Sequence, residues 1–377
     1  MAEKKNQHYV PQSYLKLFST DKKNIGIYTI SNDKTTKGPI NKQASKKYFY
    51  SKDMALEIEN ALQEVENLGI DSFKKIINHN GYKWEIIEYL NAYVFIIIQY
   101  ARTLYAVQKF QEQMEDNFLK YFYLHSNLNE IDPHLVFKID SPTLWALKIY
   151  GNMLSCCLDL KYKILSIDKK SINEKFMTSD NPVCIFNPYF EVCNNLQNDK
   201  IALGHKGIII LLTISPQHAI IIYDADVYKI GNRREWFNIT NPKDVSIINK
   251  IVAVNANEVL YYRQTDGISP DLKNFAYKLK RNNVRKSTIS SFKGNCTLSF
   301  MHFLSKTKST FNLNNITPNS IYRKYTLFLY HNPHVKECLD SKWGASTEED
   351  RKLFYKKLNE RYMVYKNLHN EDASYNK

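Results

Sequence analysis

The first half of the chain is dominated by a helical pattern of hydrophobic and polar positions. From Ala55 to Ile77, apolar residues recur every three or four positions and Glu and Lys occupy the other side, which predicts an amphipathic helix. The stretch from Trp84 to Tyr123 contains no Pro or Gly and is densely apolar in its first half, so we expect one long, largely buried helix. A third helix is expected to begin at Pro142, because proline is tolerated in a first helical turn.

After Lys161 the pattern changes to short runs rich in Ile, Val, Tyr and Leu, bounded by Asn, Pro, Gly and Asp. Such runs are typical of strands. The predicted strands are Tyr162–Ile167, Lys175–Thr178, Gly207–Thr213, His218–Tyr223 and Val259–Tyr262.

Two further helices are indicated by capping residues. Asn241 followed by Pro242 is typical of a helix start, and Val245–Val254 carries the apolar spacing behind it. The capping box Ser346–Glu349 predicts a last, strongly charged helix that ends near Asn367.

The order of these elements predicts an α+β fold. Helices come first, then a mixed β-sheet, and then a basic region and a closing helix, without the regular alternation of an α/β protein. We expect residues 1–262 to form the core, helical over 50–160 and rich in strands over 161–262. The basic region and C-terminal helix of residues 263–377 are expected to pack on that same core.

Composition predicts a chain that folds without disulfides in a reducing compartment. Its 377 residues are 44% hydrophobic, enough for a sizeable core. The six cysteines form no C-x-x-C pair and are scattered through apolar segments. The N-terminus does not resemble a signal peptide, and no apolar run reaches the ~20 residues of a spanning helix. We therefore expect a cytoplasmic protein with no membrane partner.

The net charge of +14 is unevenly distributed. From Leu272 to Lys336 there is no Asp or Glu, while twelve Lys and Arg residues are interleaved with aromatic ones. Many RNA and single-strand binders place cations on phosphates and aromatic side chains on bases. A solvated face balanced by acidic residues elsewhere explains the same charges. The residues predicted to bind nucleic acid are Lys278, Lys280, Arg281, Arg285 and Lys286.

Several short elements carry a family resemblance. Residues 7–12 read Gln-His-Tyr-Val-Pro-Gln, residues 99–103 contain Gln-x-x-Arg-Thr, and residues 179–182 read Ser-Asp-Asn-Pro. In these elements, and in Asp244 with Asn249, the chain resembles the family called domain of unknown function 4238 over roughly residues 7–262. It departs from the family pattern at Leu104, where a proline is usual. The resemblance implies a shared fold and a shared site, and no established activity.

His8 is the first candidate site residue. It lies among Tyr9, Val10 and Pro11, which favour burial, and is flanked by the polar Gln7 and Gln12. A docked imidazole at this position is suited to be a general base or a metal ligand, since histidine changes charge near neutral pH. A histidine that only makes a hydrogen bond in the core fits the same sequence.

Gln99 and Arg102 form the second candidate, because residues three apart share one face of a helix. An arginine in such an apolar stretch has to be paired. One interpretation is a structural ion pair with Glu59 or Glu66 on the preceding helix. The other is a guanidinium aimed at a phosphate or carboxylate of a ligand.

Asp180 is the third candidate. It follows a predicted strand and precedes Asn181-Pro182, where a turn is expected. A carboxylate there is suited to hold a divalent metal or to act as a catalytic acid, and it is equally suited to bind backbone amides of the turn. Asn181 and Asn249 are expected to support the site.

Other catalytic classes have no motif in this sequence. There is no Walker loop, no Gly-x-Gly-x-x-Gly, no His-Glu-x-x-His and no deaminase pattern, and glycine is scarce, with 11 residues. These observations exclude the familiar nucleotide-driven and zinc-peptidase motifs.

The leading hypothesis is a nucleic-acid-acting effector, a nuclease with a role in bacterial defence or toxicity. In this hypothesis Asp180 binds Mg²⁺ or Mn²⁺ or polarises water, His8 moves a proton, and Arg102 stabilises phosphate charge. The alternative is a non-catalytic nucleic-acid or protein-binding module, in which the same residues hold the N-terminus on the helices. A third option, an enzyme acting on a small molecule, requires a closed pocket away from the basic face.

Overall fold

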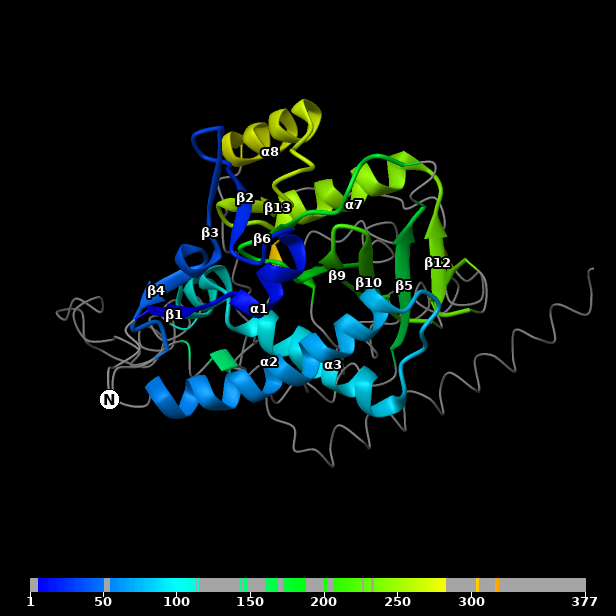
Figure 1. The fold of residues 1–377 in the computed structure, drawn as a ribbon, viewed down its shortest axis with the longest axis horizontal. Helices are drawn as coiled ribbons and strands as arrows, with labels where there is room; N and C mark the ends of the chain where they lie inside the picture. The colour runs from blue at the N-terminus through cyan, green and yellow to red at the C-terminus, as the bar shows by residue number, and fades with distance from the viewer. Residues whose placement is uncertain are drawn as a thin grey trace, which may run out of the picture.

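A computed structural model gives the fold of the chain and confirms the α+β class (Figure 1). A central sheet lies between two helices on one side, α2 and α3, and α7 on the other. The structure describes residues 6–50, 55–112, 114, 143, 146–147, 160–168, 172–187, 200–201, 207–225, 227–231, 234–282, 303–304 and 316–318.

The central sheet has five strands in the order β12-β5-β10-β9-β7. All neighbouring strands are antiparallel except β12 and β5, which are parallel, so the sheet is mixed. Its strands β9 and β10 are largely apolar and buried throughout, because helices cover both faces. The strands of the sheet are β5 (Lys161–Ile167), β7 (Cys184–Phe186), β9 (Ile209–Ser215), β10 (His218–Tyr223) and β12 (Trp236–Ile239).

Side-chain alternation divides this sheet between two cores. Ile220 and its register partners Ile164 and Leu212 face the helices α2 and α3. The neighbouring Ile221 and Leu211 face α7 (Pro242–Asn255) on the other side. Successive residues of a strand point to opposite faces, so each strand contributes to both cores.

Helices α2 (Ala55–Asn78) and α3 (Ile86–Ala101) pack closely against each other. Gly69 permits this approach, because a Cβ atom there would lie 2.4 Å from the Cβ of Phe95. The prediction of α2 is confirmed.

The single long helix predicted from Trp84 to Tyr123 is wrong, because α3 ends at Ala101 and a second helical segment, Leu104–Glu112, begins after a bend of 56°. Thr103 explains the new start, since its hydroxyl accepts a hydrogen bond from the amide of Ala106 (3.2 Å) as an N-cap does. No single helix among the described residues is both long and apolar enough to span a bilayer. The segments Ile86–Ala101 and Leu104–Glu112 reach that length and apolar content only when they are counted together.

A second, antiparallel sheet has the order β3-β2-β13-β6 and brings the N-terminal strand β2 beside β13. The short β1 pairs with β4, so that His8 lies opposite Ser45. These elements are β1 (Asn6–His8), β2 (Asn24–Thr29), β3 (Lys34–Pro39), β4 (Ser45–Lys47), β6 (Thr178–Ser179) and β13 (Val259–Tyr262).

The remaining described elements are short, apart from α8. They are α1 (Gln12–Leu15), η1 (Lys16–Phe18), η2 (Ile40–Lys42), α8 (Pro270–Asn282), the pair β11 (Tyr228–Ile230) with β15 (Ile316–Pro318), and the pair β8 (Lys200–Ile201) with β14 (Phe303–Leu304).

Most of the other predicted elements are confirmed. β5, β9, β10, β13 and α7 lie where the sequence places strands and a helix, and Asn241 caps α7 by accepting a hydrogen bond from the amide of Lys243 (3.0 Å). The strand predicted over Lys175–Thr178 is wrong except at its end, because the amides of Phe176 and Met177 donate to Pro216 and to the Asn249 side chain. Most of the helix expected from Pro142, and the last helix before Asn367, lie outside the described residues.

Candidate functional site

The N-terminal strand β1 is held in place by side chains that the sequence analysis singled out. Gln7 is fully buried, and its side-chain oxygen accepts a hydrogen bond from the amide of Tyr50 (2.6 Å). The Tyr50 hydroxyl in turn donates to the carbonyl of His8 (2.7 Å). The amide of Tyr9 donates to the carbonyl of Ala44 (2.9 Å). A segment near a chain end is therefore docked by buried polar contacts on both sides of His8.

Gln99 and Arg102 connect this segment to the end of α3. The Gln99 amide donates to the carbonyl of Tyr9 (3.0 Å), and its oxygen accepts from Nε of Arg102 (2.8 Å). Nη1 of Arg102 donates to Oε1 of Glu66 on α2 (2.7 Å). The interpretation of a structural ion pair with Glu66 is thus confirmed.

The two members of this ion pair differ in their access to solvent. The Arg102 side chain is 2% exposed, whereas the Glu66 side chain is 21% exposed. Burial disfavours the Arg102 charge, but its interactions with Tyr50 and Glu66 outweigh burial and hold the pKa of the guanidinium above its ordinary value. Arg102 therefore stays charged and fixes Glu66 from the inside.

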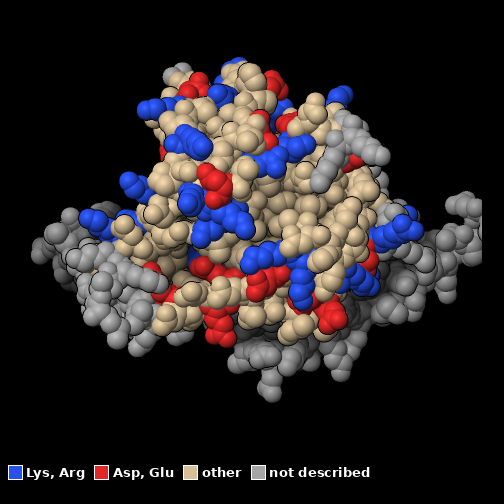
Figure 2. All heavy atoms as spheres, in the orientation of Figure 1, with Lys and Arg blue, Asp and Glu red and all other residues tan. Residues whose placement is uncertain are grey.

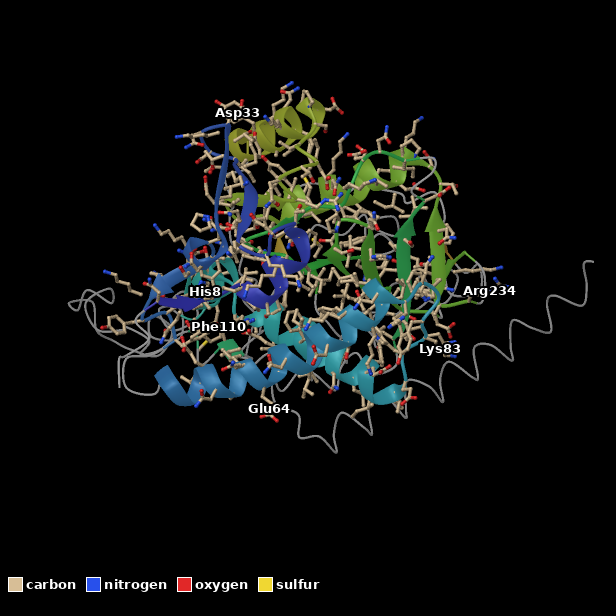
Figure 3. All side chains as sticks on the ribbon, in the orientation of Figure 1. His8, Asp33, Glu64, Lys83, Phe110 and Arg234 are labelled. Carbon is tan, nitrogen blue, oxygen red and sulfur yellow. The ribbon has the colours of Figure 1, made fainter. Side chains whose placement is uncertain are left out.

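His8 lies on β1 (Figure 3), within reach of the charges of both members of this ion pair. It is half-buried, and its Nε2 atom lies 3.3 Å from the carbonyl oxygen of Asn41, which can only accept a hydrogen bond. That contact assigns the proton to Nε2 and leaves the lone pair on Nδ1. Burial lowers the pKa of His8, the Asn41 contact opposes it, and the charges of Glu66 and Arg102 act on it in opposite directions.

Asp180 follows β6 and is buried, and its carboxylate accepts three hydrogen bonds from backbone amides. Oδ1 accepts from Asn257 (2.8 Å), and Oδ2 accepts from Glu258 (2.8 Å) and Val259 (3.2 Å). These residues connect α7 to β13, so the carboxylate fixes the entry into that strand. Binding of backbone amides was one of the two interpretations of this residue, although the amides belong to a segment far along the chain.

The negative charge of Asp180 acts on two tyrosines, one of which, Tyr9, belongs to the N-terminal segment. Burial raises the pKa of Tyr9, and the negative charge of Asp180 raises it further. The pKa of Tyr261 is raised well above its ordinary value, first by burial and then by Asp180. Asp180 is thus electrostatically linked to Tyr9, whereas His8 is linked to Glu66 and Arg102. That His8, Arg102 and Asp180 line a single pocket stays a prediction.

Hydrogen bonds of neighbouring residues connect the end of α3, which carries Arg102, with the turn after β6, which carries Asp180. The Thr103 hydroxyl donates to Oδ1 of Asn181 (3.0 Å), which joins the residue after Arg102 to the residue after Asp180. The amide groups of Asn181 and Asn255 each donate to the other's backbone carbonyl (2.9 and 2.6 Å). Tyr50, Thr103, Asn255 and Tyr261 were not predicted as site residues. Of these four, only Thr103 could have been identified from the sequence, because it belongs to the Gln-x-x-Arg-Thr element.

The other predicted residues have varied surroundings. Asn249 is buried on α7 and bonds the backbone of Met177 and Lys175, so it supports the approach to β6. Gln12 is the half-buried first residue of α1. Lys278 is exposed on α8, and Lys280 and Arg281 belong to the last turn of that helix. Arg285 and Lys286 lie outside the described residues.

The surroundings of Asp180 bear on the predicted metal ion. Every hydrogen-bond partner given above for its carboxylate is an N–H group, which complements the anion but does not coordinate a cation. Within the described part of the chain, no three His, Cys, Asp or Glu residues are arranged to hold a metal. A metal at Asp180 stays a prediction, and no step below is routed through it.

The amide contacts of Asp180 lead to a stability prediction. Asp180→Asn places an NH₂ group opposite amide donors, and a charge-assisted hydrogen bond or an unsatisfied buried donor each accounts for about 1–3 kcal/mol, so we expect a loss of about 2–4 kcal/mol in the free energy of unfolding. Urea denaturation measures it. Asp21→Asn is the matched control, because exposed Asp21 also accepts from backbone amides, of Lys23 and Asn24. Equal losses in the two variants would contradict a special role for the buried carboxylate.

Comparison with known proteins places these elements in a family. The model of a family described as "Protein of unknown function (DUF4238)" matches residues 6–266, which is more than half of the chain. This confirms the resemblance drawn from residues 7–12, 99–103 and 179–182. No curated protein and no solved structure matches the chain. All residues from Gln7 to Tyr261 discussed above lie within the match, and the basic residues from Lys278 onward lie beyond it.

Proposed function

The chain belongs to the family described as "Protein of unknown function (DUF4238)", and we propose that it is a nuclease in which His8 transfers a proton and the Glu66 carboxylate stabilises the imidazolium that forms. The observation that carries the proposal is the position of a half-buried histidine with a lowered pKa beside a partly exposed carboxylate that a buried arginine holds in place. A carboxylate beside a histidine stabilises the imidazolium that forms when the ring accepts a proton, and the charge of Glu66 acts on His8 in this direction. The predicted role in bacterial defence or toxicity and the cytoplasmic location belong to the same proposal.

His8 is suited to be the general base. Its pKa is lowered, so the ring is neutral at neutral pH, and Nδ1 keeps its lone pair because Nε2 faces the carbonyl of Asn41. A neutral imidazole accepts a proton from an attacking hydroxyl, either of water or of a ribose 2′-OH. The attacking oxygen then forms a bond to phosphorus, the bond between phosphorus and the leaving oxygen breaks, and the leaving oxygen takes its proton from the His8 imidazolium or from water.

Glu66 is the partner group, and Arg102 is a positioning residue. One oxygen of Glu66 binds Nη1 of Arg102 and the other lies 3.5 Å from the hydroxyl of Ser13. Arg102 itself is 1% exposed, with Nε and Nη1 bound to Gln99 and Glu66. This geometry does not favour the expected direct contact of Arg102 with phosphate, because a buried guanidinium would have to release Glu66 first.

Asp180 also acts as a positioning residue in this proposal. Its carboxylate orders residues 257–259 and raises the pKa of Tyr9 and Tyr261 beyond the effect of burial. Both phenols therefore stay protonated at neutral pH and remain hydrogen-bond donors.

A second candidate is a non-catalytic module that binds nucleic acid or protein. The observation in its favour is that the site residues also dock the N-terminal segment, through Gln7 with Tyr50 and Gln99 with Tyr9. In a module of this kind, the polar network has only a structural purpose.

Incubation with labelled nucleic acid distinguishes the two candidates. Purified protein is mixed with single-stranded RNA and DNA in Mg²⁺, in Mn²⁺ and in EDTA. We expect cleavage of at least one strand type, and cleavage in EDTA would show that His8 and Glu66 chemistry suffices. Binding without cleavage in all conditions would contradict the nuclease and favour the module.

A further inference from the structure

A dense group of lysines surrounds the N-terminal part of the site. Between Lys16 and Lys47 the sequence has eight lysines and two aspartates, which leaves six excess positive charges. All eight side chains are exposed. We call this group the N-terminal lysine surface. Its members are Lys16, Lys22, Lys23, Lys34, Lys37, Lys42, Lys46 and Lys47.

These lysines differ from those of the helical layer in their pairing. On α2 and around it, Lys74, Lys75 and Lys83 each form an ion pair with a carboxylate. No described carboxylate forms an ion pair with a member of the N-terminal lysine surface. The two aspartates of the segment bind elsewhere: Asp21 accepts from turn amides and Asp33 accepts from the Tyr28 hydroxyl.

Positive and negative side chains also occupy different parts of the molecular surface. Figure 2 shows Lys and Arg side chains spread over the part of this face that holds β2, β3 and β4, whereas Asp and Glu gather along α2. His8 lies on β1, which joins β4 at the edge of the lysine-bearing part. A polyanion attracted to the lysines would therefore meet the site from that side and not across α2.

The local pairing of strands places Lys47 on the face of the ladder that carries His8 and Lys46 on the opposite face, and Lys42 lies in η2, just before β4. In the register of β1 with β4, Asn6 lies opposite Lys47, Gln7 opposite Lys46 and His8 opposite Ser45. Lys47 is thus a diagonal neighbour of His8 on the same face of the ladder. Lys42 follows Asn41, whose carbonyl contacts the imidazole of His8.

A purely structural explanation covers only part of the surface. β3 is the edge strand of its sheet, and lysines on edge strands prevent pairing with other chains. That accounts for Lys34 and Lys37. It applies also to Lys46 and Lys47, because β4 is an edge of the two-stranded sheet β1-β4, but it does not account for Lys42, which belongs to η2.

We infer that Lys42, Lys46 and Lys47 bind the phosphate backbone of a single-stranded nucleic acid and lead it to His8. This inference rests on the proposed function, and it assigns the phosphate contacts that buried Arg102 is poorly placed to make. Lysine supplies a flexible point charge for phosphate. It adds a second basic surface to the one predicted in the acid-free segment beyond Leu272, and this one lies within the family match.

The test is a salt titration of binding that does not depend on cleavage. The probes are a labelled single-stranded DNA and a labelled RNA of the same sequence with 2′-O-methyl riboses, both in EDTA. The variant is Lys42→Ala, Lys46→Ala, Lys47→Ala. The matched control removes three exposed lysines from β5, β11 and α7, as Lys161→Ala, Lys229→Ala, Lys243→Ala. Thermal unfolding confirms that both variants fold, since exposed lysines contribute little to stability.

The expected result is a change in the salt dependence of affinity. Three lost phosphate contacts should make the log-log slope about two units shallower, at roughly 0.7 per contact on a single strand, while the control keeps the wild-type slope. Equal slopes in the variant and the wild type, or an equal change in the control, would overturn the inference. Absence of cleavage with this binding result intact would count against the nuclease alone.

A polyglutamate competitor separates nucleic acid from an acidic protein partner. At equal charge concentration, polyglutamate should displace the oligonucleotide poorly from the wild-type protein. If it binds as tightly as the oligonucleotide and loses that binding in the triple variant, the surface recognises an acidic polypeptide and the inference fails.

Discussion

His8→Ala should lower kcat for nucleic-acid cleavage by about 10²–10⁴-fold, the usual contribution of a general base. The side chain is half-buried, its pKa is lowered by burial, and it lies beside the Glu66 carboxylate. KM should change little, because in our proposal the lysines hold the substrate. Single-turnover cleavage of labelled RNA measures the effect. His79→Ala is the matched control, since His79 is exposed and follows the last residue of α2, about 20 Å beyond Glu66 at 1.5 Å per residue.

The pH dependence of the same reaction separates a base from a structural histidine. Because the folded-state pKa lies below 6.5, the wild-type rate should rise with pH through a midpoint below 6.5 and then stay level to neutral pH. The same lowered pKa means that His8 contributes to stability above pH 6.5, and that this contribution is lost as pH falls through the folded-state pKa. If the rate of His8→Ala still rises with pH as in the wild type, or if the substitution changes KM but not kcat, His8 does not transfer the proton.

Glu66→Ala should lower the free energy of unfolding by about 3 kcal/mol, near the lower end of the cost of breaking a buried ion pair. The substitution leaves the Arg102 charge, 2% exposed, without its carboxylate, and the partial exposure of Glu66 admits some water. Glu64→Ala is the matched control on the same helix, because Glu64 is exposed and points away from the body of the molecule (Figure 3). Urea denaturation of both variants measures the difference.

A double substitution tests the cause of that loss. Glu66→Leu with Arg102→Met removes both charges, and replacing a buried pair with apolar side chains of similar volume is often neutral or stabilising. The double variant should therefore be more stable than Glu66→Ala. If it is less stable, the ion pair is not the source of the effect, and lost packing between α2 and α3 explains it.

The short polar strands show where sequence patterns lose their information. β1, β3 and β4 carry Asn-Gln-His, Lys-Thr-Thr-Lys-Gly-Pro and Ser-Lys-Lys. They lack the apolar alternation that identifies a strand, because their pairing depends on backbone hydrogen bonds at the edge of the core. Their positions were not predicted, and the lysine surface beside His8 was missed for the same reason.

The sequence by itself determined the α+β class, the apolar strands β5, β9 and β10, the helices α2 and α7, and the family to which the chain belongs. It also determined that Arg102 requires a buried partner, because an apolar helix face offers no solvation for its charge. These properties follow from periodicity, capping and the cost of burying charge, which act over a few turns of chain.

Only the tertiary structure decided which polar groups meet. It broke the expected long helix at Arg102 and Thr103 and tied Thr103 to Asn181, 78 residues away. It surrounded Asp180 with the amides of residues 257–259 and placed His8 beside Glu66 and exposed lysines. The physical reason is that hydrogen bonds and charges depend on distances between atoms. Those distances are set by the packing of the whole core, and no local pattern in the chain records them.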